Sequence, residues 1–294
     1  MIKILFLRFL RKTGILKRLK IKIKTSINKK IFIIPILYEF NFNHYLNPED
    51  HWMLQLLSNL IGNQSYTKGF IDVGVNLGQT LLKVKSVNPV INYIGFEPNP
   101  ACIFYLNELI ALNNFQNTEI IPVGISNRTT ILKLNLFSAS LVDSSASMVE
   151  GFRNESTVTK TIHVPVFRFS DINKYKEFEI GIIKIDVEGA ELEVIKGFKD
   201  KIIADRPILI VEILPAYETD NAQRVLRQEE IQKILNELRY AIFRIIKNKH
   251  DFIKIEEIHE FGFHSDINLC DYIFAPSEQS EKLKMKLNYN NLNI

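Results

Sequence analysis

Short apolar runs alternate with longer amphipathic segments along most of the chain. The pattern predicts strands at 70–73, 92–96, 118–124, 180–185 and 208–211, and helices at 79–87, 100–113 and 222–240. Strands and helices that alternate at this spacing are typical of a mostly parallel sheet with right-handed crossovers. Two further strands, at 241–246 and 271–274, indicate an antiparallel edge. The expected fold class is therefore α/β.

The alternation of strands and helices is interrupted between residues 129 and 169. The segments 129–137 and 162–169 have the polar and apolar alternation of strands, and the Ser-rich segment 138–147 lies between them. We interpret this region as an inserted β-hairpin with a long polar loop. A long loop in a compact domain is often functional, but a Ser-rich composition is also typical of a disordered tip.

The pattern divides the chain into four segments. A basic amphipathic segment at 1–30 is followed by a strand and helix extension at 31–68, the main α/β domain at 69–275 and a polar tail at 276–294. The extension contains a helix expected at 47–61, because Asn47 and Pro48 are a strong helix start. We expect this helix to flank or cover the ligand pocket, and the tail to be mobile.

Charge is distributed unevenly. Residues 1–30 contain eleven Lys and Arg and no acid, which leaves 26 bases against 33 acids, a net charge of −7, in the rest of the chain. This balance argues against nucleic acid as the main partner. No apolar run reaches the ~18–20 residues that span a bilayer, and no secretory cleavage site follows the N-terminal segment.

The first residues have the pattern of a membrane-surface helix. On a helix, an apolar face would oppose a basic one; the apolar residues are Ile2, Leu5, Phe6, Phe9 and Leu10, and the basic residues are Lys3, Arg8, Arg11 and Lys12. A helix packed on the domain, or a frayed basic arm, explains the pattern equally well. Peripheral contact with the inner membrane surface is one expectation for this segment.

The cysteines and histidines exclude the common metal sites. Cys102 and Cys270 are far apart and match no metal or redox spacing, so we expect buried free thiols in a reducing cytoplasm. The six histidines have no zinc-binding spacing. The expected location is cytoplasmic.

A glycine turn marks the expected ligand pocket. An apolar strand runs into Gly74-Val75-Asn76-Leu77-Gly78, a helix follows, and the next strand ends on Glu97 about twenty residues later. Such a turn lets a ligand approach the backbone, and an acid at the end of the next strand binds ribose hydroxyls. The alternative is a plain strand-turn-helix whose glycines only permit a tight turn.

The spacing within this turn favours S-adenosylmethionine. In a dinucleotide fingerprint the middle position is Gly, which makes room for the pyrophosphate, whereas here it is Asn76. Asp72 would repel phosphate and suits a cationic ligand. S-adenosylmethionine combines an adenosine with an ammonium and a sulfonium, and no phosphate. Candidate cofactor-binding residues are Asp72, Gly74, Asn76, Gly78, Glu97, Asn99 and Ser126.

Acids at the ends of two further strands are the candidate catalytic residues, namely Asp186, Glu188 and Glu212. If the methyl acceptor is a hydroxyl, a carboxylate can take its proton. Asp186 and Glu212 could act as base or hold Mg²⁺, which prefers oxygen ligands, and Asp186 could equally hold the ammonium of the cofactor. Glu188 and Glu191 have a simpler alternative role, as acids that favour the next helix dipole.

Four motifs resemble the FkbM family of S-adenosylmethionine-dependent methyltransferases, with likeness from about residue 38 to 274. They are Phe-Ile-Asp-Val-Gly-Val-Asn-Leu-Gly from residue 70, Gly-Phe-Glu-Pro-Asn-Pro from 95, Ile-Lys-Ile-Asp-Val-Glu-Gly-Ala-Glu from 183, and Pro-Ile-Leu-Ile-Val-Glu from 207. The third is the most specific. One departure is Ser170-Asp171, where the family often has Leu-Asp.

The resemblance implies a class I methyltransferase fold (Rossmann-like) over 69–275, and O-methylation of a sugar or polyketide hydroxyl. It places Asp72, Gly74, Asn76 and Gly78 on the methionine and ribose side, with Glu97 on the ribose. Relatives often modify bacterial surface polysaccharides, so a glycan or small-molecule acceptor is expected. The alternatives are a non-catalytic module that binds the cofactor or a glycan, and an NAD-dependent oxidoreductase, against which no Tyr-x-x-x-Lys pair is present.

Overall fold

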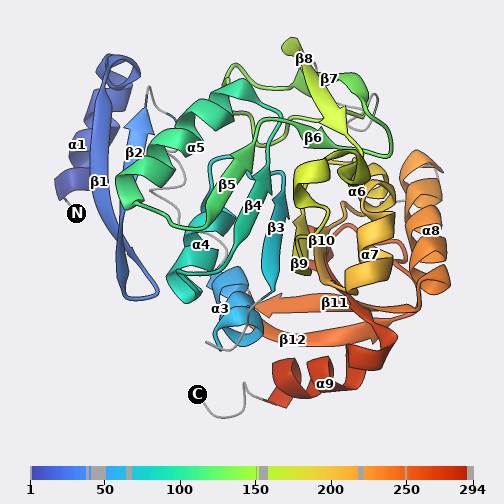
Figure 1. Cartoon of the computed structure of the whole chain (residues 1–294). Coiled ribbons are helices and arrows are strands. Elements are labelled where there is room, and N and C mark those ends of the chain that lie inside the picture. The colour runs from blue at the N-terminus through green and yellow to red at the C-terminus, as the bar shows by residue number, and fades with distance from the viewer. Residues whose placement is uncertain are drawn as a thin grey trace.

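A computed structural model describes residues 2–37, 40, 51–63, 68–149, 151, 158–217, 222–248 and 250–289. Its centre is an eight-stranded sheet in the order β12-β11-β13-β10-β9-β3-β4-β5 (Figure 1). The predicted helix start at residues 47–50 lies outside the described residues. The rest of that prediction is confirmed, because α3 (His51–Ile61) ends just before Gly62.

The parallel half of the sheet follows the prediction from the apolar runs. It consists of β5 (Thr118–Ile121), β4 (Tyr93–Phe96), β3 (Gly69–Val73), β9 (Ile180–Ile185) and β10 (Ile208–Glu212). All five residues of β3 are buried, as expected for a strand that has helices on both faces. Glu212 ends β10 at the same edge of the sheet where β3 and β9 end.

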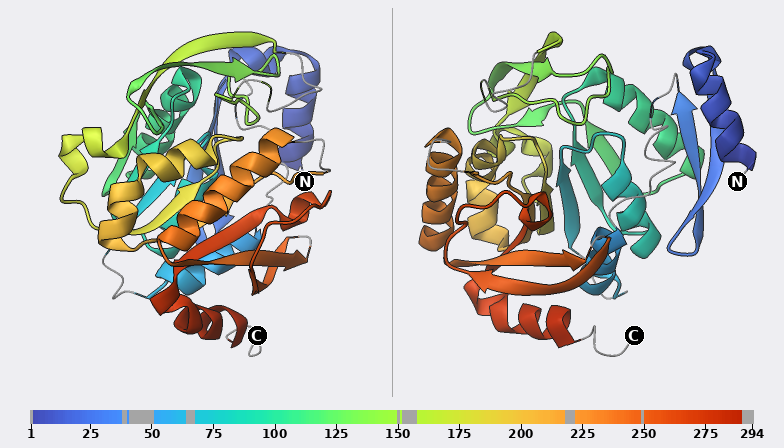
Figure 2. Two further views of the ribbon diagram at one scale, coloured as in Figure 1. Left: turned by 90° about the vertical axis from the view of Figure 1, so that its right-hand side faces the viewer. Right: turned by 180° about the vertical axis from the view of Figure 1, so that it is seen from behind.

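Two groups of helices cover the sheet, and Figure 2 shows them on its opposite faces. On one face α3 packs with α4 (Gln79–Val87) and α5 (Pro100–Asn113). On the other lie α6 (Glu191–Gly197), α7 (Lys199–Asp205) and α8 (Ala222–Glu237). Asn99 begins α5, because its side chain accepts a hydrogen bond from the amide of Ala101 at 3.0 Å and Pro100 follows it.

The antiparallel end of the sheet has three strands. β13 (Asp271–Pro276) lies between β10 and β11 (Tyr240–Asn248), and β12 (Asp251–Ile258) pairs with β11 at the outer edge. The predicted antiparallel end is therefore confirmed, but the prediction missed β12. The cause is its composition, since four of its eight residues are charged.

The inserted hairpin is confirmed. β7 (Thr130–Leu136) pairs with β8 (Lys160–Phe167) in antiparallel register, and β6 (Gly124–Ile125) adds a third strand to this separate sheet. The predicted strand at 118–124 is thus divided into β5 and β6, one in each sheet. The loop after β7 is described to residue 149 and folds back toward the main sheet.

The N-terminal residues form a small unit of their own. α1 (Ile2–Lys12) and η1 (Ile15–Arg18) pack on the hairpin of β1 (Lys20–Ile27) and β2 (Lys30–Leu37). Leu7, Leu10 and Ile23 are buried in the core of this unit, whereas Phe9 is 59% exposed. The predicted apolar face of the helix is therefore only partly correct, because Leu7 and not Phe9 is buried with Leu10.

The C-terminal tail is packed as far as it is described. After η5 (Ser277–Gln279), α9 (Ser280–Lys284) and η6 (Met285–Tyr289) place Leu283 and Leu287 in the core beside α3 and β12. The expected mobile tail is wrong for this part, because two apolar positions four residues apart bury one helical face. Cys102 and Cys270 are buried free thiols, as predicted. None of the described helices is both long enough and apolar enough to cross a membrane.

Candidate active site

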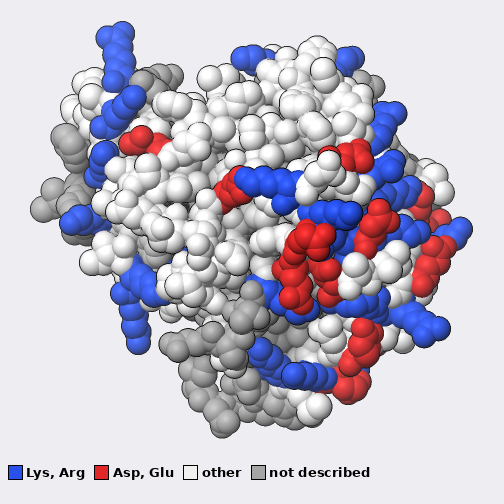
Figure 3. Space-filling model, in the orientation of Figure 1, with Lys and Arg blue, Asp and Glu red and all other residues white. Residues whose placement is uncertain are grey.

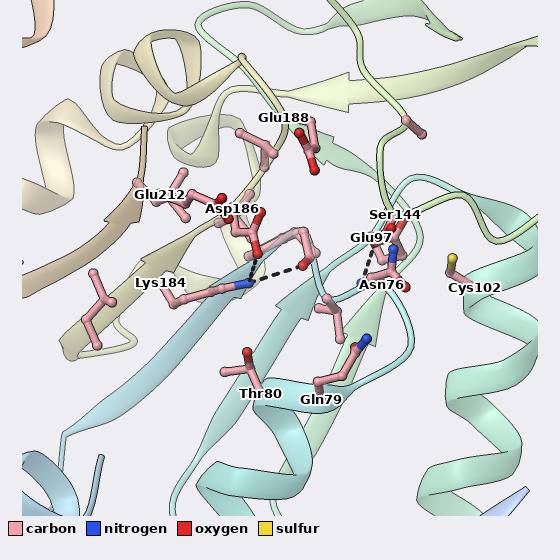
Figure 4. A pocket seen from close by; sticks show the side chains of 18 of the residues that line it. Asn76, Gln79, Thr80, Glu97, Cys102, Ser144, Lys184, Asp186, Glu188 and Glu212 are labelled. Carbon is pink, nitrogen blue, oxygen red and sulfur yellow. Dashed lines mark hydrogen bonds and ion pairs between the residues drawn. The ribbon is translucent and has the colours of Figure 1, made fainter. Parts of the chain in front are cut away.

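A cavity of about 630 Å³ opens at the carboxyl ends of β3, β4, β9 and β10. In open α/β sheets this edge is where ligands bind. Seven of the predicted residues line it, namely Gly74, Asn76, Glu97, Asn99, Asp186, Glu188 and Glu212. Figure 4 shows Asp186, Glu188 and Glu212 on one side of this cavity and Asn76 and Glu97 on the other.

The glycine turn brings the end of β3 against the end of β9. Gly74 has φ 85°, and a Cβ built there would lie 1.9 Å from the carbonyl oxygen of Asp186. No side chain fits this contact. Gly74 therefore allows the turn and Asp186 to form one continuous wall of the cavity.

Gly78 has a different role from the one predicted, because it does not line the cavity. Its φ is 81°, and a Cβ there would lie 2.8 Å from Leu109 of α5. The missing side chain lets the start of α4 pack closely on α5. Gly78 therefore supports the pocket from behind.

Glu97 is fixed by main-chain amides from two segments. Its Oε2 accepts a hydrogen bond from the amide of Asn76 at 2.8 Å, and its Oε1 accepts one from the amide of Asn99 at 2.8 Å. Burial raises the pKa of Glu97 to about 7, although both amides lower it. A carboxylate has about four acceptor positions. One position on each oxygen therefore remains for a pair of ligand hydroxyls.

The loop of the inserted hairpin forms a further wall that the sequence did not assign to the site. Asp143, Ser144, Ala146 and Met148 line the cavity, and Figure 4 shows Ser144 beside Glu97. The carbonyl of Leu141 accepts a hydrogen bond from Asn99 Nδ2 at 2.8 Å. The loop is thus fixed to the segment after β4.

Asp143 organises this loop from within. One of its carboxylate oxygens accepts the amides of Phe137 at 2.6 Å and Ser138 at 2.9 Å, and the other accepts the amide of Ser145 at 3.1 Å. Ser147 Oγ donates to the carbonyl of Glu188 at 2.7 Å, which ties the loop to the segment after β9. These contacts favour the interpretation of a functional loop over that of a disordered tip.

Asp72 lies behind the cavity wall, where it forms a buried charge network. Tyr93 donates its hydroxyl to Asp72 Oδ2 at 2.5 Å, and Lys184 Nζ lies 3.4 Å from Asp72 Oδ1. Lys184 Nζ also lies 3.1 Å from Asp186 Oδ2 (Figure 4). Asp72 is fully buried and outside the cavity lining. The expected ligand contact of Asp72 is therefore wrong, and its partner is the ammonium of Lys184.

The network explains how a lysine is accommodated in a core strand. Burial raises the pKa of Asp72, and the ammonium of Lys184 opposes this effect. Burial alone would lower the pKa of Lys184, but the carboxylates of Asp186 and Asp72 more than offset it and raise that pKa. Lys184 is therefore cationic, and it holds one oxygen of Asp186 while the other faces the cavity.

Asp186 and Glu212 form an interacting acid pair. The charge of Asp186, together with burial, raises the pKa of Glu212 well above its usual range. Lys184 Nζ lies beside Asp186, 3.1 Å from its Oδ2. The predicted magnesium site gains no support, since no group of three or more His, Cys, Asp or Glu among the described residues could hold a metal ion.

Two further predicted residues lie elsewhere. Ser126 is buried, and it lines a neighbouring hollow of about 280 Å³ rather than the main cavity. It follows β6 in the small sheet, not a strand of the main sheet. Glu191 has the helix role considered from the sequence, since its Oε1 accepts the amide of Gly189 at 2.8 Å at the start of α6. Glu188 instead lines the cavity.

The far end of the cavity combines the expected flanking helix with the antiparallel end of the sheet, which the sequence did not connect to the site. Trp52 and Met53 reach it from α3, and Lys247, Asn268 and Asp271 reach it from the antiparallel end. Lys247 forms an ion pair with Asp271, and its Nζ lies 4.6 Å from the centroid of the Trp52 ring. The expectation that the helix before the glycine turn flanks the pocket is thus confirmed for its described part.

The cavity residues fit S-adenosylmethionine. Glu97 retains acceptor positions for two ribose hydroxyls, and Asn76 Oδ1 is buried and has no hydrogen-bond partner among the described residues. Asp186 presents a partly exposed carboxylate to a cationic group. Asn76 lines the cavity at the position where a dinucleotide fingerprint has Gly to make room for the pyrophosphate.

The sheet has five parallel strands, and the antiparallel strand β13 lies between them and the pair of β11 and β12. This order defines a class I methyltransferase fold, with its pocket at the carboxyl edge of the sheet. A family model described as the methyltransferase FkbM domain matches residues 72–245. The chain belongs to the FkbM methyltransferase family.

Two curated relatives agree with this assignment. The chain is 28% identical over 166 residues to Methyltransferase sdnD of Sordaria araneosa, a match that covers 48% of this chain and 64% of that protein. It is 23% identical over 145 residues to Methyltransferase 1 of Beauveria bassiana (strain ARSEF 2860), which covers 45% and 58%. The chain thus spans about 64% and 58% of the lengths of these relatives.

One solved structure to which this chain is similar is the methyltransferase FkbM of Methylobacillus flagellatus KT. It matches with a TM-score of 0.44 and 16% identity, over 81% of this chain and 53% of that one. A putative caffeoyl-CoA O-methyltransferase from Staphylococcus aureus matches with a TM-score of 0.45 and 15% identity, over 94% and 100%.

Proposed function

We propose that this chain transfers the methyl group of S-adenosylmethionine to a hydroxyl oxygen of a sugar in a glycan or of a secondary metabolite. The observation that carries the proposal is the acid pair of Asp186 and Glu212, which faces Glu97 across one cavity in an FkbM domain. One side of the cavity suits the nucleoside part of the donor, and the other suits an acceptor that must lose a proton.

The donor side is preorganised before any ligand binds. Main-chain amides fix both oxygens of Glu97 toward the cavity, so little side-chain freedom is lost when the ribose arrives. The hairpin loop, fixed through Asn99 and Glu188, lines this side of the cavity. Asp186 lies between the two halves, where it attracts the positive charge of the donor.

The acceptor side of the cavity has carboxyl groups that can take the proton of the acceptor hydroxyl. When bound, S-adenosylmethionine supplies an electrophilic methyl group on a good neutral leaving group. Asp186 and Glu212 together can accept the hydroxyl proton as the new bond forms. Lys184 holds one oxygen of Asp186, which leaves the second oxygen for the acceptor. Orientation of the two reactants supplies much of the rate enhancement.

The acceptor class is supported by chemistry and by family resemblance. A hydroxyl needs a base, whereas an already nucleophilic thiolate or amine does not. Glu188, Asn268 and Asp271 add polar groups to the cavity that suit an acceptor rich in hydroxyls. The FkbM resemblance implies sugar and polyketide hydroxyls.

Methyl transfer from labelled S-adenosylmethionine to a panel of glycans and hydroxylated metabolites tests the proposal. Wild type should label an acceptor hydroxyl, and Asp186→Asn should lower kcat by about 10²–10⁴-fold, as is typical when a general base is lost. Asp171→Asn is the matched control, because Asp171 is outside the cavity lining and bonds Thr129. Full activity of Asp186→Asn would remove that residue from the mechanism.

A further inference from the structure

We infer that the exposed face of β1 is a docking surface for anionic lipid. This lysine face consists of Lys20, Lys22 and Lys24 on β1, together with Ile31 of β2 and Phe104 of α5. The inference is independent of the proposed methyl transfer, because none of these residues lines the cavity.

The face is built by the strand periodicity. Alternate residues of a strand point to opposite sides. Lys20, Lys22 and Lys24 are exposed, whereas Ile23 on the other side is buried under α1 with Leu7. α1 therefore covers the apolar side of the hairpin, and the lysines form a row on the side that α1 leaves open.

The surroundings make this face strongly cationic. Its three lysines belong to a segment, residues 1–30, with eleven Lys and Arg and no acid. In Figure 3 the left edge of the molecule, where Figure 1 places α1 and β1, carries blue side chains with one red patch at its inner margin. The right half of the same view mixes red and blue. Each Lys or Arg close to an anionic bilayer contributes about fivefold to binding.

Two large apolar side chains lie in the same face and favour lipid over nucleic acid. Ile31, opposite Ser26 in the hairpin register, is 71% exposed, and Phe104 is 49% exposed. Lys20 Nζ lies 5.8 Å from the centroid of the Phe104 ring, which places this ring beside the lysine row. Apolar side chains among bases insert at the headgroup boundary of a bilayer, where they bury their area. Phosphodiester backbones offer them no such environment.

Sedimentation of the full chain with vesicles tests the inference. We expect binding to vesicles of phosphatidylcholine mixed with phosphatidylglycerol, and no binding to phosphatidylcholine alone. Lys22→Gln with Lys24→Gln should weaken binding by about 25-fold, at about fivefold for each lost charge. Ile31→Ser should weaken binding without any change in charge.

Matched variants decide where the contact lies. Lys233→Gln with Lys282→Gln removes two exposed charges elsewhere and should change binding little. An equal loss in that pair would overturn the inference, because only net charge would matter. A larger loss in Arg8→Gln with Lys12→Gln would assign the contact to α1 instead. Tighter binding to a DNA duplex, unaffected by Ile31→Ser, would make nucleic acid the partner and overturn it as well.

Discussion

Glu97 is a buried carboxylate whose ligand contact should depend on pH. Its pKa is raised to about 7, mainly by burial. Ribose hydroxyls donate to the ionised form, so ligand binding favours loss of the proton. Affinity for S-adenosylhomocysteine should therefore rise by up to about tenfold per pH unit as pH increases toward 7, and then level off. Calorimetric titration between about pH 6 and pH 8 measures this.

The chain offers a matched control for this prediction. Burial raises the pKa of Glu191 to about 7 as well, but this residue lies in the first turn of α6, accepts the amide of Gly189, and is outside the cavity lining. Glu97→Gln should remove the pH dependence and weaken binding by about 1.5–3 kcal/mol. Glu191→Gln should leave the pH dependence intact. A pH dependence that follows Glu191 instead would exclude the ribose role of Glu97.

Lys184 should matter for stability through its buried partner. Lys184→Met leaves the fully buried Asp72 without its cation, which costs about 3–5 kcal/mol in similar buried pairs. Adding Asp72→Asn removes the unpaired charge, and the amide can still accept the hydroxyl proton of Tyr93. The double variant should therefore be more stable than Lys184→Met in urea unfolding. Additive losses would show that the two residues do not act as a pair.

Individual site residues were predictable where they follow a strand. Glu97, Asp186 and Glu212 were assigned because strand ends meet at one edge, and all three line the cavity. Whether a side chain is buried behind the cavity or faces it was not predictable from the spacing of residues in the sequence. Asp72 precedes the glycine turn but points into the core, where Lys184 two residues before Asp186 compensates it. A lysine within an otherwise apolar strand was the available signal.

At the scale of elements, the hydrophobic pattern predicted most of the main sheet. The helix at 100–113 and the strand at 180–185 have the predicted bounds, because a cap with Pro and a continuous apolar run mark them. Elements whose partner faces are distant in sequence were harder to predict. β12 has a charged residue at four of its eight positions yet completes the sheet, and the segment at 277–289 contributes two buried leucines to an otherwise polar stretch.

The hairpin loop illustrates what local pattern leaves open. Its Ser-rich sequence is compatible with a disordered tip or with a functional loop. The bonds of Asp143 within the loop, and those that join the loop to Asn99 and Glu188, favour the functional loop. Residues at the ends of four main-sheet strands line the cavity, and residues of the loop line it as well. The assembly of the site from separate elements is why its full lining could not be derived from motifs alone.

At the scale of the whole molecule, we propose that the cavity binds an adenosyl sulfonium cofactor rather than a dinucleotide. Glu97 lines the cavity, where we propose that it binds a ribose, and Asn76 lines it at the position where a dinucleotide fingerprint has Gly. The FkbM family assignment is consistent with this claim.

Calorimetric titration of the purified chain with S-adenosylhomocysteine, and separately with NAD, tests the claim most directly. We expect binding of S-adenosylhomocysteine with a dissociation constant of about micromolar order, near −8 kcal/mol, and no heat with NAD. Binding of NAD without binding of S-adenosylhomocysteine would contradict it, because the turn would then accept a pyrophosphate despite Asn76.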